Sequence, residues 1–234
     1  MSKQQTAAID GAPPTLYTID FLAAHTVYTN AAGKRLPGVT TVLGMLNKPA
    51  LLGWAWRLGK EGIELNAARQ QAADIGTVAH ALCEAHLRGM ELDRSNIAPD
   101  ALSKAETSYL RFLDFWQKEN LALVAVERAL VSERMQVGGT LDILARRPDD
   151  SLVLVDLKTS KAIYDEMLVQ AATYAAIYEE VEGVVIRDVY IIRIGKEDAD
   201  DLEVRNVGQR VERVAAFAAL AEARRKLQAA GVKV

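Results

Sequence analysis

Cysteine is almost absent from this sequence: Cys83 is the one thiol among 234 residues. A single thiol excludes an intramolecular disulfide framework, and no Cys/His spacing typical of a zinc site occurs. The cysteine content therefore fits a reducing compartment, in which disulfides are rare.

Signals for export or membrane insertion are missing as well. The first residues, MSKQQTAAIDGAPP, contain no basic segment followed by an apolar one, and no apolar run approaches roughly 18 residues. We expect a cytoplasmic protein with no membrane span, in the host cell cytoplasm if the protein is viral. Residues 1–14 are polar and small and end in Pro13-Pro14, which predicts a disordered lead before a single domain over residues 15–234.

An excess of positive charge is also missing. The formal net charge is −3 and the isoelectric point is about 5.7, so no global basic field attracts nucleic acid. This balance counts against a tight non-specific nucleic-acid binder, yet it permits an enzyme with a local basic channel. A phosphate-binding loop for ATP is absent too, because Gly33-Lys34 lacks the upstream glycine and the following Ser or Thr.

The composition itself is that of an ordinary globular protein, with 50% hydrophobic and 25% charged residues. Apolar periodicity and turn-forming residues predict where its elements lie. We expect helices over residues 49–60, 76–88, 99–120, 164–180 and 208–230, and strands over residues 121–132, 140–145, 152–157 and 184–194.

The most informative stretch is a predicted β-hairpin. Thr140 to Ala145 and Leu152 to Leu157 are short apolar runs, and Pro148 to Ser151 between them is a strong turn sequence. Asp142 and Asp156 interrupt the two runs. A carboxylate buried alone is costly, so these acids need a cation or another partner.

The length of the turn decides whether the two acids meet. A three-residue loop, Pro148 to Asp150, places Asp142 directly opposite Asp156 on one face of the hairpin. A two-residue loop separates them unless a bulge, for which Gly138-Gly139 is a candidate, compensates. We expect the three-residue loop. Lys158 then shares the face of Asp156, and two carboxylates beside one ammonium form a site for a hard cation.

With its neighbours this hairpin resembles a known nuclease family. Gly-Thr-x-Asp, a hairpin and Asp-x-Lys, followed by Gln170 and Tyr174, is similar to the pattern of the PD-(D/E)XK nuclease superfamily. The RecB-like branch, with its phage exonucleases and the mitochondrial genome maintenance exonuclease, is the most similar. The resemblance covers roughly residues 37–195. It implies an α/β fold with a mixed central sheet flanked by helices, in the order αβββαβ.

The resemblance also implies a site. In that branch a histidine on an upstream helix joins the acids, and His80 in Gly-Thr-Val-Ala-His matches it. Asp142, Asp156 and Lys158 are then the catalytic residues. The implied metal ligands are His80, Asp142, Asp156 and the Leu157 carbonyl. Lys158 would activate the attacking water and stabilise the pentacovalent phosphate, and a nearby cation should lower its pKa.

Four residues that follow Asp156 in the sequence are candidates for substrate contacts. Gln170 and Tyr174 lie four apart on one helical face, and Thr159 and Ser160 follow the strand end, where loops often carry function. The alternatives are structural: Gln170 caps a strand edge, Tyr174 packs with Ile177 in the core, and Thr159 and Ser160 cap a turn.

Two further acids have candidate supporting roles. Glu84 shares a helical face with His80 and either orients its imidazole or lies on the surface. Glu127, within the strand over residues 121–132, either helps the metal site or pairs with Arg128 or Arg134.

The helix over residues 49–60 carries two tryptophans and two cations. Tryptophans at this density, Trp54 and Trp56, are expected in the core, with Arg57 and Lys60 on the exposed face. The alternative is that the helix stacks a base and holds phosphates.

Together these patterns predict a Mg²⁺- or Mn²⁺-dependent DNA exonuclease of phage or prophage type, acting in DNA recombination, repair or replication. Oxygen ligands suit Mg²⁺, and an imidazole widens the tolerance toward Mn²⁺. Neither ATP nor an iron–sulfur cluster is expected, since the clusters of some relatives need four cysteines. DNA is the expected partner, and a recombination or single-strand-binding protein is a further candidate. A structure-specific endonuclease and a non-catalytic DNA-binding subunit that keeps the fold are the open alternatives.

Overall fold

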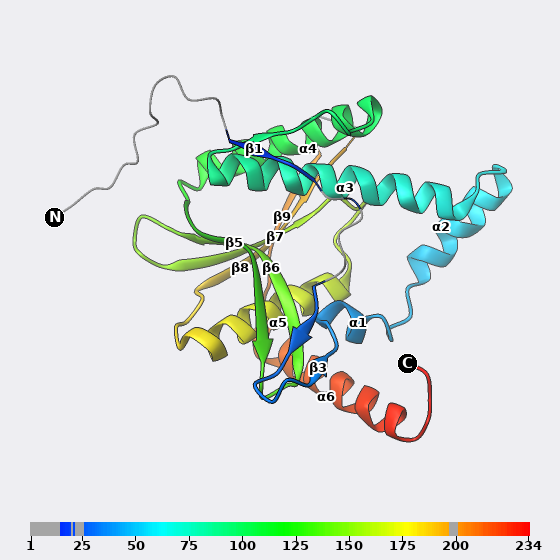
Figure 1. Ribbon diagram of the computed structural model, residues 1–234, viewed down its shortest axis with the longest axis vertical. Coiled ribbons are helices and arrows are strands. Elements are labelled where there is room, and N and C mark those ends of the chain that lie inside the picture. The colour runs from blue at the N-terminus through cyan, green and yellow to red at the C-terminus, as the bar shows by residue number, and fades with distance from the viewer. Residues whose placement is uncertain (1–14, 20, 22–25, 197–200) are drawn as a thin grey trace.

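A computed structural model describes residues 15–19, 21, 26–196 and 201–234 of the chain (Figure 1). The predicted lead over residues 1–14 lies outside these described residues. The elements in chain order are β1 (Leu16–Tyr17), β2 (Tyr28–Thr29), β3 (Arg35–Leu36), α1 (Val39–Leu43), α2 (Pro49–Lys60), α3 (Leu65–Arg88), β4 (Glu91–Leu92), α4 (Pro99–Lys118), β5 (Ala122–Ser132), β6 (Val137–Arg146), β7 (Leu152–Lys158), α5 (Asp165–Glu182), β8 (Asp188–Ile194), β9 (Leu202–Asn206) and α6 (Arg210–Ala229).

A mixed five-stranded sheet forms the centre of the molecule. Its order is β5-β6-β7-β8-β9, with β7 parallel to β8 and the other neighbours antiparallel. The run α4-β5-β6-β7-α5-β8 confirms the expected α/β fold and its αβββαβ order. The sequence patterns miss β9, a half-exposed edge strand in which charged residues interrupt the apolar period.

Helices cover both faces of the sheet. Figure 1 shows α3 and α4 on one side, and α5 and α6 on the other. Ile143 and Val155 pack toward α4 with Phe112, whereas Leu144 and Leu154 belong to the core under α5. Strands buried on both faces read as continuous apolar runs, which explains the composition of β6 and β7. Within the described residues, none of the helices is both long and apolar enough to span a membrane.

Helix α3 begins eleven residues earlier than the sequence patterns predict, since it starts at Leu65 rather than Gly76. Glu64 is its N-cap and accepts hydrogen bonds from two backbone amides. Thr77, a residue type that often caps a helix N-terminus and that follows the predicted start, donates to the Ala73 carbonyl within the helix. A threonine satisfied in this way is compatible with a helix interior. The predicted end is confirmed, because Gly89 adopts a left-handed conformation with φ of 67°.

The β6–β7 hairpin has the predicted three-residue loop. Arg147 donates its backbone N–H to the Ser151 carbonyl at 3.0 Å, which leaves Pro148 to Asp150 as the loop. Asp150 has a φ of 66°, as the last position of such a loop requires. The strands pair as far as Ile143 with Val155, so Asp142 and Asp156 are the next residues on the two strands.

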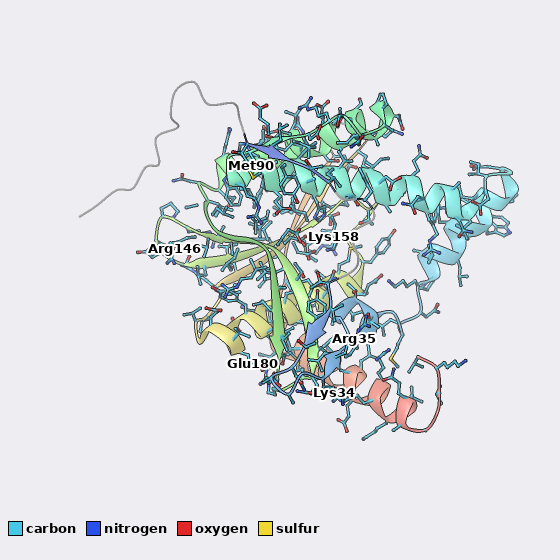
Figure 2. All side chains as sticks on the ribbon, in the orientation of Figure 1. Lys34, Arg35, Met90, Arg146, Lys158 and Glu180 are labelled. Atoms are coloured by element: carbon cyan, nitrogen blue, oxygen red, sulfur yellow. The ribbon has the colours of Figure 1, made fainter. Side chains whose placement is uncertain are left out.

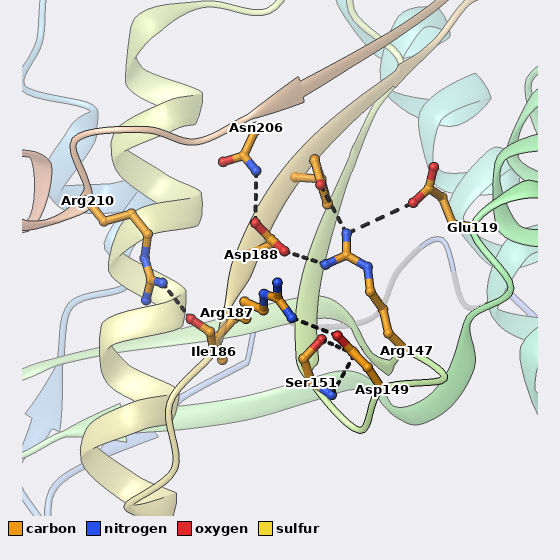
Figure 3. A network of polar contacts seen from close by, with 10 residues as sticks. Glu119, Arg147, Asp149, Ser151, Ile186, Arg187, Asp188, Asn206 and Arg210 are labelled. Carbon is orange, nitrogen blue, oxygen red and sulfur yellow. Dashed lines mark hydrogen bonds and ion pairs between the residues drawn. The ribbon is translucent and has the colours of Figure 1, made fainter.

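Charged side chains fasten this turn to β8 (Figure 3). Arg147 forms an ion pair with Asp188 and donates to the Tyr190 hydroxyl at 3.0 Å, and Arg187 donates to Asp149 at 2.7 Å. The network lies at the opposite end of the hairpin from the two acids. It stabilises the register that brings the acids to one end of the sheet.

Candidate active site

Three side chains from three elements converge at the end of the hairpin. His80 of α3, Glu127 of β5 and Asp142 of β6 each offer one ligand atom, and these atoms all lie within 4.8 Å of one another. His80 Nδ1 and Asp142 Oδ2 are 3.9 Å apart. An imidazole with two carboxylates is a donor set suited to a divalent cation.

Glu127 occupies an unusual backbone conformation in the middle of its strand. Its φ is 48°, a left-handed value that costs a residue with a side chain about 1–2 kcal/mol. Its neighbours on β5 pair with the neighbours of Asp142 on β6, so the two acids face one another across the ladder. Strain kept at one position beside an acidic cluster is a pointer to function. This strain favours the metal-site role of Glu127.

A close helix–strand approach brings His80 over the sheet. Gly76 lies one helical turn before His80 and on the same face. A Cβ atom at Gly76 would be 3.0 Å from Thr159 Oγ1, at the end of β7. A glycine inside a helix costs about 1 kcal/mol relative to alanine. Here it allows α3 to approach β7 closely.

Asp156 and Lys158 form an ion pair beside this cluster. Asp156 is fully buried and its Oδ2 lies 2.5 Å from Lys158 Nζ. Its Oδ1 has no hydrogen-bond partner among the described atoms. Burial, with a contribution from Asp142, raises the pKa of Asp156 to about 7, although Lys158 opposes the shift.

Lys158 lies between α3 and α1 in the view of Figure 2. Burial lowers its pKa, but the nearby acids, with Asp156 first and then Asp142 and Glu127, outweigh burial, so the Lys158 pKa is raised. The lysine is therefore a charged ammonium held by carboxylates. The lower Lys158 pKa expected from the sequence applies to the site with a metal cation bound, whereas the raised pKa applies to the site without one.

His80 and Asp142 also contact the backbone of β7. The Leu157 N–H donates to Asp142 Oδ2 at 2.8 Å. Burial lowers the pKa of His80, while Asp142 and a hydrogen bond to the Leu157 backbone oppose the shift. The neutral imidazole that results keeps a lone pair for a ligand.

The carboxyl of Glu127 is influenced by the same acids. Although Glu127 is exposed by accessible surface, desolvation of its carboxyl among the neighbouring groups, followed by the charges of Asp142 and Glu84, raises the pKa of Glu127 to about 8. Arg128 and Arg134, its alternative partners, pair instead with Glu182 and Glu180. The acids of the cluster thus repel one another, and a bound cation would relieve that repulsion.

Tyr174 and Gln170 lie beneath the site on α5. Gln170 Nε2 donates to the Tyr174 hydroxyl at 3.0 Å, and Tyr174 is buried. A Cβ atom at Gly139 would be 2.4 Å from the Tyr174 ring, and one at Gly138 would be 2.0 Å from Tyr28. The two glycines therefore make room for aromatic rings rather than for a bulge, and the irregular register lies in β5 instead.

The remaining candidates near the site have local partners. Ser160 donates to the Ala162 carbonyl at 2.8 Å, which matches its turn-capping alternative. Glu84 is buried and accepts hydrogen bonds from the Tyr17 hydroxyl at 2.6 Å and from Arg88 at 2.8 Å. Its carboxylate is thus engaged away from the His80 ring.

Arg57 and Lys60 lie on α2, which packs against the N-terminal part of α3 (Figure 1). They are therefore not part of the cluster around His80. The expectation that both tryptophans lie in the core is wrong for Trp56, which is 66% exposed, whereas Trp54 is half-buried. The reason is that α2 packs on a helix instead of the sheet, so that its outer face stays exposed.

The structure also reveals a groove that the sequence patterns do not indicate. It has a volume of about 790 Å³, reaches Glu127, and is lined by the β2–β3 hairpin, α1 and the end of α6. Arg35 and Arg224 supply positive charge, and the Tyr28 hydroxyl lies 2.9 Å from Thr140 Oγ1. Arg224 comes from the last helix, so only the folded chain brings it near the acids.

Comparison with known proteins supplies the family. Two solved structures that match this chain are a Eubacterium rectale protein whose name proposes an exonuclease, and an alkaline exonuclease from Laribacter hongkongensis. The match to the first has 13% sequence identity and a TM-score of 0.42, and it covers 72% of this chain and 67% of the other chain. The match to the second has 15% identity and a TM-score of 0.35, and it covers 69% of this chain and 91% of the other chain. No curated protein sequence matches. The sequence model of one nuclease family matches residues 53–233, most of the chain and all of the site. The chain therefore belongs to the PD-(D/E)XK nuclease superfamily.

Proposed function

We propose that this chain is a Mg²⁺- or Mn²⁺-dependent DNA exonuclease of phage or prophage type. The observation that carries the proposal is the convergence of His80, Glu127 and Asp142 within 4.8 Å, beside Lys158. Hydrolysis of a phosphodiester brings a nucleophile to an anion and expels an alkoxide, so neutralising charge is the chief requirement.

The residues present fit a hard divalent cation. His80, Asp142 and Glu127 would hold it, with Asp156 and the Leu157 carbonyl as the further ligands that the family resemblance implies. A cation bound there would polarise the phosphate and offset its charge. Desolvation first, and the charge of Asp142 after it, raises the pKa values of Glu127 and Asp156, and a cation that offsets the negative charge of these acids is consistent with this assignment.

Lys158 has a distinct proposed role. As a partly buried ammonium, it would donate hydrogen bonds to the phosphate and to the attacking water. Asp156 holds Lys158 Nζ in place through the ion pair at 2.5 Å. Gln170, Tyr174, Thr159 and Ser160 stay proposed as the support of the substrate side of this site.

The experiment compares matched variants on end-labelled linear DNA with Mg²⁺, Mn²⁺ or neither. We expect Asp142→Ala and Lys158→Ala each to lower cleavage by at least about 10³-fold, because each removes charge stabilisation in the transition state. The controls are Asp114→Ala and Lys161→Ala, an exposed acid and an exposed lysine outside the site, which should cleave like the parent. Unchanged circular dichroism would show that the fold is retained.

Circular DNA of the same sequence separates the exonuclease from an endonuclease. An exonuclease leaves the closed circle intact and degrades the linear form from its ends. Parental cleavage by Asp142→Ala would refute the assigned site, and DNA binding without divalent-dependent cleavage would favour a non-catalytic subunit.

A further inference from the structure

Helix α2 presents an exposed apolar face to solvent. Leu52 and Trp56 are 68% and 66% exposed. With Lys60 they recur every four residues, so the three side chains line up along one side of the helix. The opposite side carries Leu58, which is buried, and Trp54, which is half-buried. A tryptophan exposed to this extent on a helix whose other face is packed suggests a ligand for its ring.

Two glycines flank the exposed ring. A Cβ atom added at Gly53 or Gly59 would meet no atom within 4 Å in the described part of the chain. Alanine would fit at both positions and would favour the helix. Glycine there leaves the backbone open to close approach by another molecule.

The charge of this segment runs against that of the whole chain. Residues 46–60 carry three cations and no acid, whereas the chain has a net charge of −3. Lys48 pairs with Glu166 at 3.8 Å, which leaves Arg57 and Lys60 as the charges that bear on the exposed face. Lys60 Nζ lies 4.6 Å from the centroid of the Trp56 ring. The complementary ligand is therefore anionic and offers flat apolar surfaces, which describes a nucleic-acid strand with unpaired bases. A second copy of this chain would set like charges of the two faces against each other.

The position of α2 fits a nucleic-acid strand that extends from this helix to the cluster of His80, Glu127 and Asp142. Figure 1 shows α2 and the N-terminal part of α3 extending beyond the sheet. Along α3, the fifteen residue steps from Leu65 to His80 span about 22 Å at 1.5 Å per residue. A substrate held at both places must therefore contain several nucleotides.

We infer that this face of α2 binds single-stranded nucleic acid, with a base stacked on Trp56 and phosphates against Arg57 and Lys60. The inference rests on the proposed function and names its substrate class. It assigns α2 a role in holding the strand and none in the bond cleavage itself.

Binding of fluorescent single-stranded and duplex DNA, measured by anisotropy in EDTA, tests the inference. Trp56→Ala should weaken single-strand binding about 5- to 150-fold, the range for losing one stacked base, and should change duplex binding less. Lys60→Ala should weaken binding and reduce the slope of log K against log salt by about 0.7. Leu110→Ala and Lys118→Ala, exposed positions on α4, are the matched controls and should bind like the parent.

A second readout separates binding from chemistry. With Mg²⁺ or Mn²⁺, Trp56→Ala should cleave a dinucleotide, too short to reach α2, at the parental rate and a long single strand more slowly below saturation. Equal single-strand affinity of Trp56→Ala and the parent overturns the inference. The inference is also overturned if Trp56→Ala lowers the oligomeric mass and leaves the DNA affinity unchanged, because this face of α2 would then bind a second copy of the chain. A parent that binds single strands but cleaves nothing would refute the proposed function alone.

Discussion

The acidic residues of the site lie where ionisation of their carboxyls is unfavourable. Asp156 is fully buried beside Lys158, and its pKa is raised to about 7, chiefly by burial. Glu127 and Asp142 add further negative charge within a few ångströms. Without a cation the raised pKa values of Asp156 and Glu127 favour their protonated carboxyls, so the stability of the metal-free protein should depend on pH.

We predict that Asp156 makes the metal-free protein less stable as pH rises. An unfolded chain loses the Asp156 proton near pH 4, whereas the folded protein keeps it until about pH 7. Between these values the folded state binds more protons, so the free energy of unfolding falls with rising pH and levels off above pH 7. Asp156→Asn, which has the same shape without the ionisation, should flatten this slope.

Thermal unfolding in EDTA from pH 4 to pH 8 measures this effect. The parent and Asp156→Asn should differ in melting temperature by an amount that grows with pH, by several degrees in favour of the variant. Asp114→Asn, in an exposed ion pair, is the control and should follow the parent. Parallel curves for the parent and Asp156→Asn would contradict the buried, cation-free state assigned to Asp156.

Sequence patterns capture only some of these residues. Asp142, Asp156 and Lys158 could be predicted because short-range alternation and the turn length fix their register. Glu127 stayed ambiguous, since its role depends on a left-handed backbone and on the arginines beside it finding other partners. Such choices are made by tertiary contacts, which a local pattern does not contain.

Among the elements, the close packing of α5 against β6 fixes the position of the site. The Tyr174 ring of α5 packs against Gly139 of β6, three residues before Asp142. Because the ring is buried and cannot move freely, Gly139→Ala should destabilise the fold by about 1–3 kcal/mol, the typical cost of overpacking. It should also reduce activity, since the displaced strand carries Asp142.

Denaturant titration of Gly139→Ala measures this cost. Gly59→Ala is the matched control, because its added methyl group meets no atom within 4 Å and should leave stability unchanged or raise it by about 1 kcal/mol. If Gly139→Ala is as stable as the parent, the close approach of β6 and α5 is not what fixes the position of Asp142.

Element boundaries illustrate the same limit of prediction. The β6–β7 hairpin follows from its turn residues, and α2 ends where its sequence predicts. The start of α3 does not, because Thr77 carries a cap signal that the helix interior satisfies by another hydrogen bond. Strand β9 is held by the ion pairs of Arg193 on β8 with Glu203 on β9 and with Asp201, the residue before β9.

At the scale of the whole molecule, the fold brings distant segments to one end of a sheet. An imidazole from α3 and acids from β5, β6 and β7 meet there, and the ends of α1 and α6 line the neighbouring groove. The family pattern anticipates most of the first set. The groove and the exposed face of α2 follow from packing between elements that are far apart in sequence.

Anomalous scattering from a crystal soaked in Mn²⁺ would show whether the side chains of the site bind a metal ion. We expect one strong peak within coordination distance of His80, Glu127 and Asp142, with Lys158 beside it, and its loss in a His80→Ala, Asp142→Ala double variant. A soaked crystal without density between these three side chains, taken from protein that still degrades DNA with Mn²⁺, would contradict this expectation.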